Sequence, residues 1–222
     1  MTTSAVLARI RLNPFSRDVQ RDLRDATQMH KTLMRLVPDN LGDTPRRDTG
    51  LLFRLDETDG AGTLLVQATT ALDPARLPDG YGHTQVKDLT GMFTALRRGL
   101  PVRYRITVNP AKRARLPLEQ KNKRGRVVPL SGADADAWWI RKATAAGLHL
   151  TGLLPTPQRP VRPRGAGATA MRHSLIRYDG TATITDPDTL AQTLVTGIGR
   201  GKSYGAGLLS LAPAAGTEQA EH

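Results

Sequence analysis

The chain has 222 residues and a formal net charge of +12, from 32 Lys and Arg against 20 Asp and Glu. It contains no cysteine, which excludes disulfide bonds, thiolate metal sites and cysteine nucleophiles. No apolar stretch approaches the roughly 18 residues of a membrane span, and the N-terminus lacks an apolar run of signal-peptide length, so we expect a soluble, cytoplasmic protein.

The first half of the chain shows the pattern of a strand, a long helix, two strands and a further helix. Ser16 and Asp18 are typical of a helix start, and an apolar stripe at helical spacing continues to Pro38. The stripe consists of Val19, Leu23, Ala26, Leu33 and Val37. The predicted elements are strands at residues 5–12, 51–55 and 63–68, a helix at 16–37, a turn at 59–62, a loop at 73–82 and a weak helix at 88–98.

The second half has more strands and two helices. Residues 102–108 alternate strictly, with Arg103 and Arg105 on one face, which predicts a strand. Asp186 followed by Pro187 is typical of a helix start. The predicted elements are strands at residues 102–108, 127–130, 148–154, 174–178, 182–185 and 208–211, a turn at 179–180, and helices at 133–146 and from 186 onward.

This element order indicates an α+β protein built from two units of roughly βαββαβ type. We therefore predict tandem ferredoxin-like, or RRM-like, domains with antiparallel sheets and helices on one face of each. The expected boundary divides the chain into residues 1–98 and 99–222. No sequence repeat links the halves, so this prediction depends on element order alone.

The positive charge is concentrated in two windows of the chain. Residues 97–126 hold eleven basic residues and one acidic residue, and residues 159–178 hold five arginines and no acid. The remainder carries sixteen basic and nineteen acidic residues. A local excess of this kind is typical of a surface that binds a polyanion. Aromatic residues make up only 4% of the chain, which favours groove and phosphate contacts over base stacking.

The first window contains a basic excursion at residues 112–126 that is too charged to fold onto a core. A solvated loop is the alternative, but the mutual repulsion of its charges favours contact with a polyanion, and a slim basic ribbon suits duplex RNA, which is read through shape and phosphates. The candidate RNA contacts are Arg103, Arg105, Lys112, Arg113, Arg115, Lys121, Lys123, Arg124 and Arg126, with Arg159, Arg162 and Arg164 as a second contact from the other window.

Residues 197–211 form a glycine-rich segment, GIGRGKSYGAGLLSL. Glycine at this density lets backbone N–H groups approach a phosphate, and Lys202 and Ser203 add a charge and a hydroxyl, so we predict phosphate contact there. The candidate glycines are Gly197, Gly199 and Gly201. The alternative is a helix end and a tight turn. A Walker A loop is excluded, because Thr196 occupies its first glycine position and the segment follows a helix and precedes a strand.

The five histidines offer no metal site, because none pairs with another at metal-ligand spacing and no carboxylate cluster lies beside them. We expect neither a metal nor a cofactor. His30 falls near the centre of the apolar stripe of the first predicted helix, and this periodicity favours a core histidine. A functional role requires that this part of the helix face a cleft, which spacing alone does not establish.

Several segments, taken in order, resemble the CasE family, the repeat-cleaving endoribonucleases of type I-E CRISPR systems within the glycine-rich-loop RAMP superfamily. The segments are TQMH at 27–30, RYRITVNPAK at 103–112, RVVPL at 126–130, the helix at 138–147 and the glycine-rich segment at 197–211. The last is the most specific of them.

The resemblance implies metal-independent cleavage of the CRISPR repeat stem-loop, in which a ribose 2′-OH attacks the adjacent phosphate and leaves a 2′,3′-cyclic phosphate and a 5′-OH. His30 matches the family's general acid/base, a task that suits an imidazole. Lys202 matches the basic residue of the glycine loop, which would neutralise the developing phosphate charge. The family commonly carries a tyrosine three residues before the histidine, where this chain has Thr27, which the resemblance makes the third candidate catalytic residue.

The resemblance also implies that the product stays bound and that the protein joins the Cascade complex, with no membrane partner and a monomeric free state. A non-catalytic RNA-binding scaffold with the same fold is the alternative, which Thr27 favours.

Overall fold

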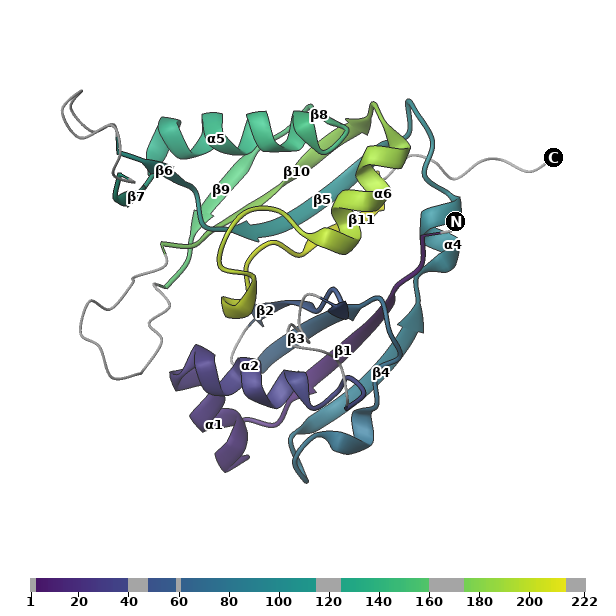
Figure 1. The fold of residues 1–222 in the computed structure, drawn as a ribbon, viewed down its shortest axis with the longest axis vertical. Coiled ribbons are helices and arrows are strands. Elements are labelled where there is room, and N and C mark those ends of the chain that lie inside the picture. The colour runs from purple at the N-terminus through teal and green to yellow at the C-terminus, as the bar shows by residue number, and fades with distance from the viewer. Residues whose placement is uncertain (1–2, 40–47, 59–60, 115–124, 160–173, 215–222) are drawn as a thin grey trace.

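The computed structural model describes residues 3–39, 48–58, 61–114, 125–159 and 174–214. These residues form two antiparallel four-stranded layers, with an additional strand beside the second, and a small separate hairpin (Figure 1). Every helix within the described ranges is too short or too polar to cross a membrane.

The first sheet has the strand order β2–β3–β1–β4. Its strands are β1 (Val6–Leu12), β2 (Leu52–Thr58), β3 (Ala61–Ala68) and β4 (Gly82–Asp88), and its helices are α1 (Arg17–Arg24) and α2 (Ala26–Met34), with a 3-10 turn, η1 (Pro74–Arg76), before β4. Alternate residues of β1, Ala8, Ile10 and Leu12, face a core that includes Met29 and Leu33 of α2. The helices therefore cover one face of this sheet, and we call the other its open face.

The second sheet has the order β11–β5–β10–β8, with β9 beside β10. Its strands are β5 (Pro101–Val108), β8 (Leu148–Leu150), β9 (Leu154–Pro157), β10 (Ile176–Ile184) and β11 (Leu209–Pro213), and its helices are α5 (Gly132–Ala145) and α6 (Pro187–Thr196). The hairpin consists of β6 (Ala111–Arg113) and β7 (Val127–Pro129), the short helix α4 (Thr90–Thr94) precedes β5, and the 3-10 turn η3 (Lys202–Tyr204) precedes β11. The core beneath α5 centres on Trp139, whose ring stacks on Tyr178 at 5.9 Å and lies 5.6 Å from Tyr104.

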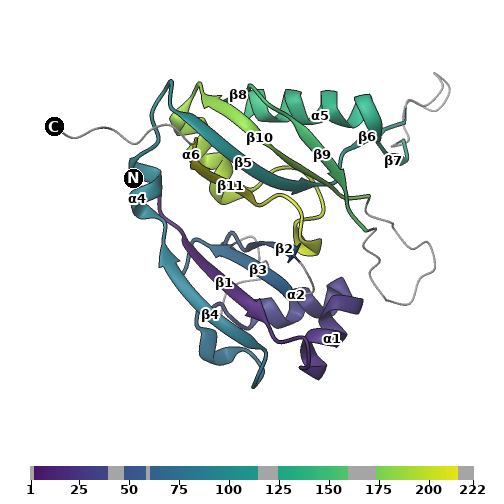
Figure 2. The same ribbon diagram turned by 180° about the vertical axis from the view of Figure 1, so that it is seen from behind.

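Both sheets follow the order of a ferredoxin-like fold, in which the first and third strands are central, and the predicted tandem arrangement is confirmed. Figures 1 and 2 show α5 on the outer side of the second sheet and α1 and α2 on the outer side of the first, with the sheets between them. The first sheet ends at Asp88 and the second begins at Pro101. A domain boundary at residues 98 and 99 stays a prediction.

The single long helix predicted at 16–37 is wrong, because the chain breaks at Asp25. This residue has an extended backbone with φ −141°, and its carboxylate accepts the N–H of Thr27 at 2.9 Å, so it ends α1 and caps α2. The break resets the helical phase, and Leu23, expected in the apolar stripe, is 46% exposed. By contrast, Asp186 caps α6 as predicted, accepting the N–H of Thr189 at 3.0 Å.

The strand β4 was not predicted, and the helix expected at 88–98 shrinks to α4. The sequence of β4, GHTQVKD, is polar because the strand lies at the sheet edge and is exposed on both faces. An edge strand of this kind lacks the apolar alternation on which strand prediction depends.

The turn predicted at residues 179–180 is also wrong, because β10 runs through both residues. Gly180 is required there by packing: a Cβ at this position would lie 2.1 Å from the carbonyl oxygen of Gly152 and 2.8 Å from the Tyr104 hydroxyl. The predicted strand at 148–154 is likewise divided, into β8 and β9, on either side of this contact.

We expect Gly180→Ala to lower the free energy of unfolding by about 1–3 kcal/mol, because the added methyl group overpacks the contact with Gly152. Urea unfolding measures the change. Gly91→Ala is the matched control, since a Cβ at Gly91 meets nothing within 4 Å. Equal stability of the two variants would contradict the packing explanation.

Candidate active site

His30 lies on the second turn of α2, at the margin of the helix's buried side. Met29 and Leu33 are buried, and His30 follows Met29 by about 100° of helix rotation, so it is only half-buried while its Nδ1 atom is covered. A continuous apolar stripe predicted that His30 lies at the centre of the core. The break at Asp25 changes the helical phase and turns His30 away from the core centre.

The helix that carries His30 packs against the turn that carries Lys202. Helix α2 contacts η3, and β2 contacts the same turn, so two elements of the first half of the chain meet a turn near its C-terminal end. Figure 1 shows the glycine-rich segment descending from the second sheet onto α2 and β2. Thr27 lies on the first turn of the same helix and is half-buried. The three predicted catalytic residues therefore belong to two elements in contact.

Lys202 is half-buried and donates from its ammonium to the carbonyl of Thr196, the last residue of α6. A helix C-terminus carries partial negative charge, so this contact suits a lysine. The aliphatic part of the Lys202 side chain lies beside Gly207, since a Cβ there would lie 3.3 Å from the Lys202 Cγ. Ser203, in the same 3-10 turn, is half-buried as well.

The glycines of this segment are explained largely by the fold itself. Positive φ angles occur at Gly197, Gly199, Gly201, Gly205 and Gly207. A Cβ at Gly197 would lie 2.7 Å from a methyl group of Leu52, and one at Gly207 would lie 2.8 Å from the carbonyl oxygen of Ile198. Tight packing thus accounts for much of the glycine content of this segment. The glycines are therefore weaker support for phosphate contact than the sequence alone indicated.

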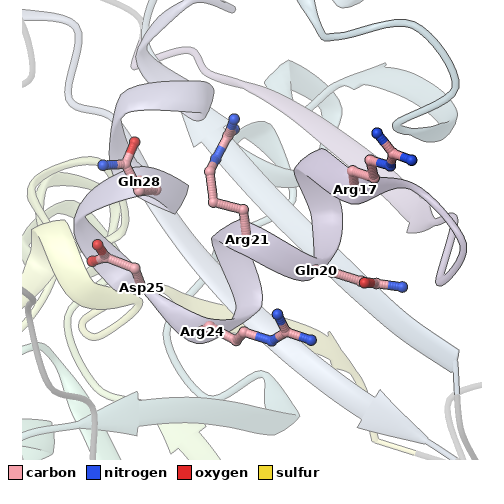
Figure 3. A pocket seen from close by; sticks show the side chains of 6 residues that line it. All are labelled: Arg17, Gln20, Arg21, Arg24, Asp25 and Gln28. Atoms are coloured by element: carbon pink, nitrogen blue, oxygen red, sulfur yellow. The ribbon is translucent and has the colours of Figure 1, made fainter.

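A polar hollow of ≈ 490 Å³ lies beside α1 and the first turn of α2, and it was missed by sequence reasoning (Figure 3). Its lining consists of Arg17, Gln20, Arg21, Arg24, Asp25 and Gln28. Arg21 is neutralised there by Asp18 at 2.6 Å and Asp22 at 2.9 Å. Because arginines and aspartates alternate along α1, the net charge of the hollow is small.

Buried Asp22 fixes α1 to the chain that leads into β4. The hydroxyl of Tyr81 donates to its carboxylate at 3.0 Å, and both side chains are almost fully enclosed. Burial, reinforced by this carboxylate, raises the pKa of Tyr81 well above its usual range, so the phenol remains a donor throughout the physiological range.

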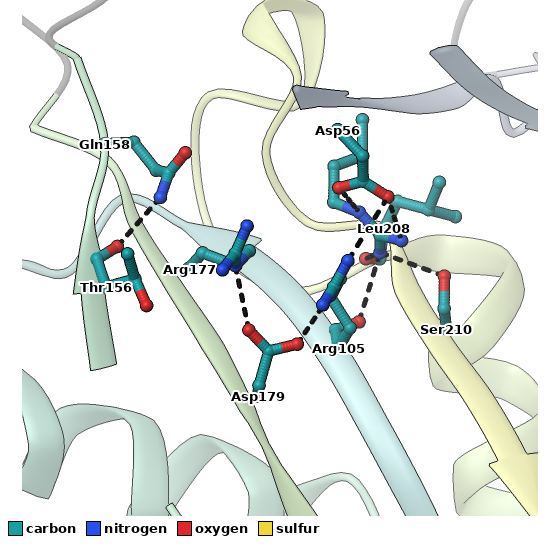
Figure 4. A network of polar contacts seen from close by, with 9 residues as sticks. Asp56, Arg105, Thr156, Gln158, Arg177, Asp179, Leu208 and Ser210 are labelled. Atoms are coloured by element: carbon teal, nitrogen blue, oxygen red, sulfur yellow. Dashed lines mark hydrogen bonds and ion pairs between the residues drawn. The ribbon is translucent and has the colours of Figure 1, made fainter. Parts of the chain in front are cut away.

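Arg54, on the open face of the first sheet, joins the two sheets. Figure 4 shows its partners Asp56, Leu208 and Ser210 gathered at this point. Arg54 is 2% exposed and forms a two-pronged ion pair with Asp56 at 2.9 and 3.0 Å. One of its terminal nitrogens also donates to Ser210 Oγ at 2.9 Å and to the carbonyls of Arg105 and Leu208 at 3.2 and 3.3 Å. This junction fixes β2 against β5 and β11, and so determines how α2 meets the glycine-rich segment.

A second link lies beside the first. Gln67, 3% exposed on β3, donates to the carbonyl of Leu194 on α6 at 2.7 Å. Two buried polar side chains of the first sheet, Arg54 and Gln67, thus donate to backbone carbonyls of the second sheet and of its helix α6.

The predicted RNA contacts fall into three groups: side chains that already bind another part of the protein, side chains that are only exposed, and residues outside the described ranges. Arg105 is occupied by Asp179 and by the junction, where its guanidinium lies 3.9 Å from Asp56. Arg103 is exposed and donates from its Nε to the carbonyl of Pro213 at 3.2 Å. Lys112 is exposed and pairs with Asp134 at 3.3 Å, and Arg113 donates to the carbonyl of Gly125 at 3.1 Å.

The remaining predictions concern loop residues. Arg126 and Arg159 are exposed. Arg115, Lys121, Lys123, Arg124, Arg162 and Arg164 lie outside the described residues. Within the described ranges, no group of three or more His, Asp or Glu side chains is arranged to hold a metal ion.

Tandem ferredoxin-like sheets carry this site, and the family model described as CRISPR associated protein matches residues 6–213. The CRISPR-associated endoribonuclease Cse3 of Thermus thermophilus is 33% identical over 220 residues, which cover 93% of this chain and 99% of that protein. The CRISPR system Cascade subunit CasE of Escherichia coli is 30% identical over 195 residues, covering 86% and 93%.

Among solved structures, Thermus thermophilus Cse3 bound to an RNA representing a pre-cleavage complex has a TM-score of 0.79 and 30% identity, covering 95% of this chain and 100% of that one. The chain belongs to the CRISPR-associated Cse3/CasE family.

We expect Arg54→Met to lower the free energy of unfolding by about 3–5 kcal/mol, because it leaves Asp56 largely buried without its main partner. Urea denaturation measures the loss, and Arg97→Met, at an exposed arginine, should change stability by less than about 0.5 kcal/mol. Adding Asp56→Leu to Arg54→Met should recover part of the loss, since no buried carboxylate remains. A loss below about 1 kcal/mol for Arg54→Met would contradict the role of this junction.

Proposed function

We propose that the protein is a metal-independent endoribonuclease that binds the CRISPR repeat stem-loop and cleaves it at the base of the hairpin. The observation that carries this proposal is the contact of α2, with His30, against the turn with Lys202. Further support comes from the Thermus thermophilus relative, which is an endoribonuclease and has been solved with an RNA that represents a pre-cleavage complex.

In the proposed reaction His30 acts as the general acid/base. It removes the proton of the ribose 2′-OH, the 2′-oxygen forms a bond to the adjacent phosphorus, and the bond from phosphorus to the 5′-oxygen breaks. The protonated His30 imidazole then gives this proton to the leaving 5′-oxygen, so the products are a 2′,3′-cyclic phosphate and a 5′-OH and His30 returns to its neutral form. Lys202 stabilises the extra negative charge on the phosphorane, for which its ammonium must exchange the Thr196 carbonyl for a phosphate oxygen.

Thr27 limits the chemistry available near His30. A threonine hydroxyl can donate or accept a hydrogen bond, but it does not titrate as a phenol does. Its backbone N–H already caps α2 through Asp25. The proposed mechanism therefore assigns proton transfer to His30 and gives Thr27 at most a positioning role.

We also propose that the protein acts in the cytoplasm, is monomeric when free and, once it has cut the RNA, remains bound as a Cascade subunit. The relative from Escherichia coli is a Cascade subunit, which supports this part of the proposal.

The second candidate function is a non-catalytic RNA-binding scaffold of a CRISPR ribonucleoprotein. Two observations favour it: Thr27 in place of a phenol, and the existing bond from Lys202 to Thr196. A scaffold would bind the same RNA without cutting it, so the cleavage assay separates the two functions.

The test of catalysis is cleavage of a labelled repeat stem-loop in EDTA. We expect a shortened product with a cyclic phosphate end, and His30→Ala should slow cleavage at least about 100-fold, the usual contribution of a general acid/base. His149→Ala, at an exposed histidine of β8, is the matched control and should cleave normally. A need for Mg²⁺, or an unchanged rate for His30→Ala, would refute the mechanism.

The basic excursion generates a separate prediction about binding. Replacing Arg113, Arg115, Lys123 and Arg124 together by glutamine should weaken binding of the stem-loop and flatten its dependence on salt. The slope of log K against log salt should fall by up to about one per lost phosphate contact. Affinity titrations at several salt concentrations measure it, and an unchanged slope would show that the excursion does not contact the RNA.

A further inference from the structure

A basic patch on the open face of the first sheet has no role in the proposed reaction. The register of β1 with β3 and β4 places Arg9, Arg11 and Lys87 on this face, together with Gln85 and, opposite Arg11, His83. All five are exposed, and they lie on the side of the sheet opposite α1 and α2, hence away from the helix that carries His30. They also lie on the two strands furthest from the junction at β2.

The charges of this patch are not neutralised within the described part of the chain. Neither Arg11 nor Lys87 forms a side-chain hydrogen bond or ion pair there, and Arg9 donates only to the amide oxygen of Gln85. That bond orients the guanidinium without cancelling its charge. Asp56 is the one carboxylate that the strand registers place on this face among the described residues, and it is already bound by Arg54.

The spacing brings these cations close together. Arg9 and Arg11 are two residues apart on one strand, roughly 7 Å, and Lys87 is diagonal to Arg9 across the β1–β4 pair, at about 7–8 Å. Like charges at this separation repel one another. A bound polyanion removes this repulsion, so the patch is better suited to a complex than to the free protein.

The chemistry of the face identifies the kind of polyanion. RRM-like sheets bind single-stranded RNA on the face away from their helices, with aromatic residues stacked on bases. Here the neighbours of the cations on β1 and β3 are Leu7, Thr63, Leu65 and Gln67, and the registers place no Phe, Tyr or Trp on the described part of the face. Contact must therefore be made through phosphates.

We infer that the patch formed by Arg9, Arg11 and Lys87 binds the phosphates of a single-stranded RNA segment that flanks the stem-loop. This inference rests on the proposed function, because it assigns a second surface to the same RNA. Recognition is independent of base sequence and strongly dependent on salt.

The experiment compares three RNAs that carry 2′-deoxyribose at the scissile position and so remain uncut: the bare stem-loop, and the stem-loop with a single-stranded extension on its 5′ or its 3′ side. The wild-type chain should bind at least one extended RNA more tightly than the bare stem-loop. The variant Arg9→Gln/Arg11→Gln/Lys87→Gln should lose this gain and bind the bare stem-loop normally. The salt slope for the extended RNA should fall by about 2, from three contacts at about 0.7 each.

A second triple variant, Arg35→Gln/Arg97→Gln/Arg141→Gln, removes the same charge from exposed arginines elsewhere and should keep the gain. Thermal unfolding checks the fold of both. If the first triple variant is destabilised, Lys87→Gln alone, at an exposed position without side-chain partners in the described structure, should still lose part of the gain.

Two outcomes would overturn the inference: a wild-type chain that gains nothing from either extension, or a patch variant that keeps the gain. If the patch variant binds all three RNAs as the wild-type chain does, the patch does not bind RNA, and an acidic protein surface becomes its expected partner. Cleavage of the all-ribose bare stem-loop by the wild-type chain tests the proposed function separately. Failure of the nuclease proposal and failure of the patch proposal can therefore be told apart.

Discussion

The buried guanidinium of Arg54 connects the two halves of the molecule, and the geometry of the candidate site depends on it. A charge so fully removed from water is tolerated only when its donors are satisfied. Asp56 neutralises it from the same strand, while Ser210 and two carbonyls of the second sheet take the remaining hydrogen bonds. The sheets therefore meet in one arrangement, in which the acceptors of β5 and β11 lie where this side chain ends.

That arrangement brings together two segments that neither sheet could place alone. Helix α2 belongs to the core of the first sheet, whereas the turn with Lys202 belongs to the second, and they touch where the Arg54 junction holds β2 beside the start of β11. The glycines of the segment serve this contact. Gly197 lies against Leu52 of β2 at a distance that excludes a side chain, so the segment can approach the first sheet closely.

Much of the fold could be predicted from local patterns, and the exceptions have identifiable causes. The strand at 102–108 alternates clearly, and the cap at Asp186 follows the usual rule. Gly180 has the appearance of a turn residue, yet it is a strand residue pressed against Gly152, a contact from another strand that no local pattern contains. The polar sequence of β4 likewise reflects its place at the edge, which is a property of the whole sheet.

The site was predicted less completely than the fold. The family resemblance selected His30 and Lys202, whereas helical periodicity placed His30 in the core because the break at Asp25 is not marked by glycine or proline. Arg54 was not selected at all, since a single arginine in a strand has no pattern that indicates burial. The uneven charge of the chain located the candidate RNA contacts of the second half but not the patch on β1 and β4. Lys87 is distant in sequence from Arg9 and Arg11 and becomes their neighbour only through strand pairing.

The Arg54 junction also determines which partner must adapt when RNA binds. Opening the sheets would withdraw three acceptors from a buried cation at once, so hinge motion between them is costly. The protein thus presents a fixed surface, and in the proposed reaction the rotation that aligns the 2′-oxygen with the phosphorus occurs in the RNA. Selectivity among hairpins then reflects how easily the base of each stem unstacks, as well as which contacts it makes.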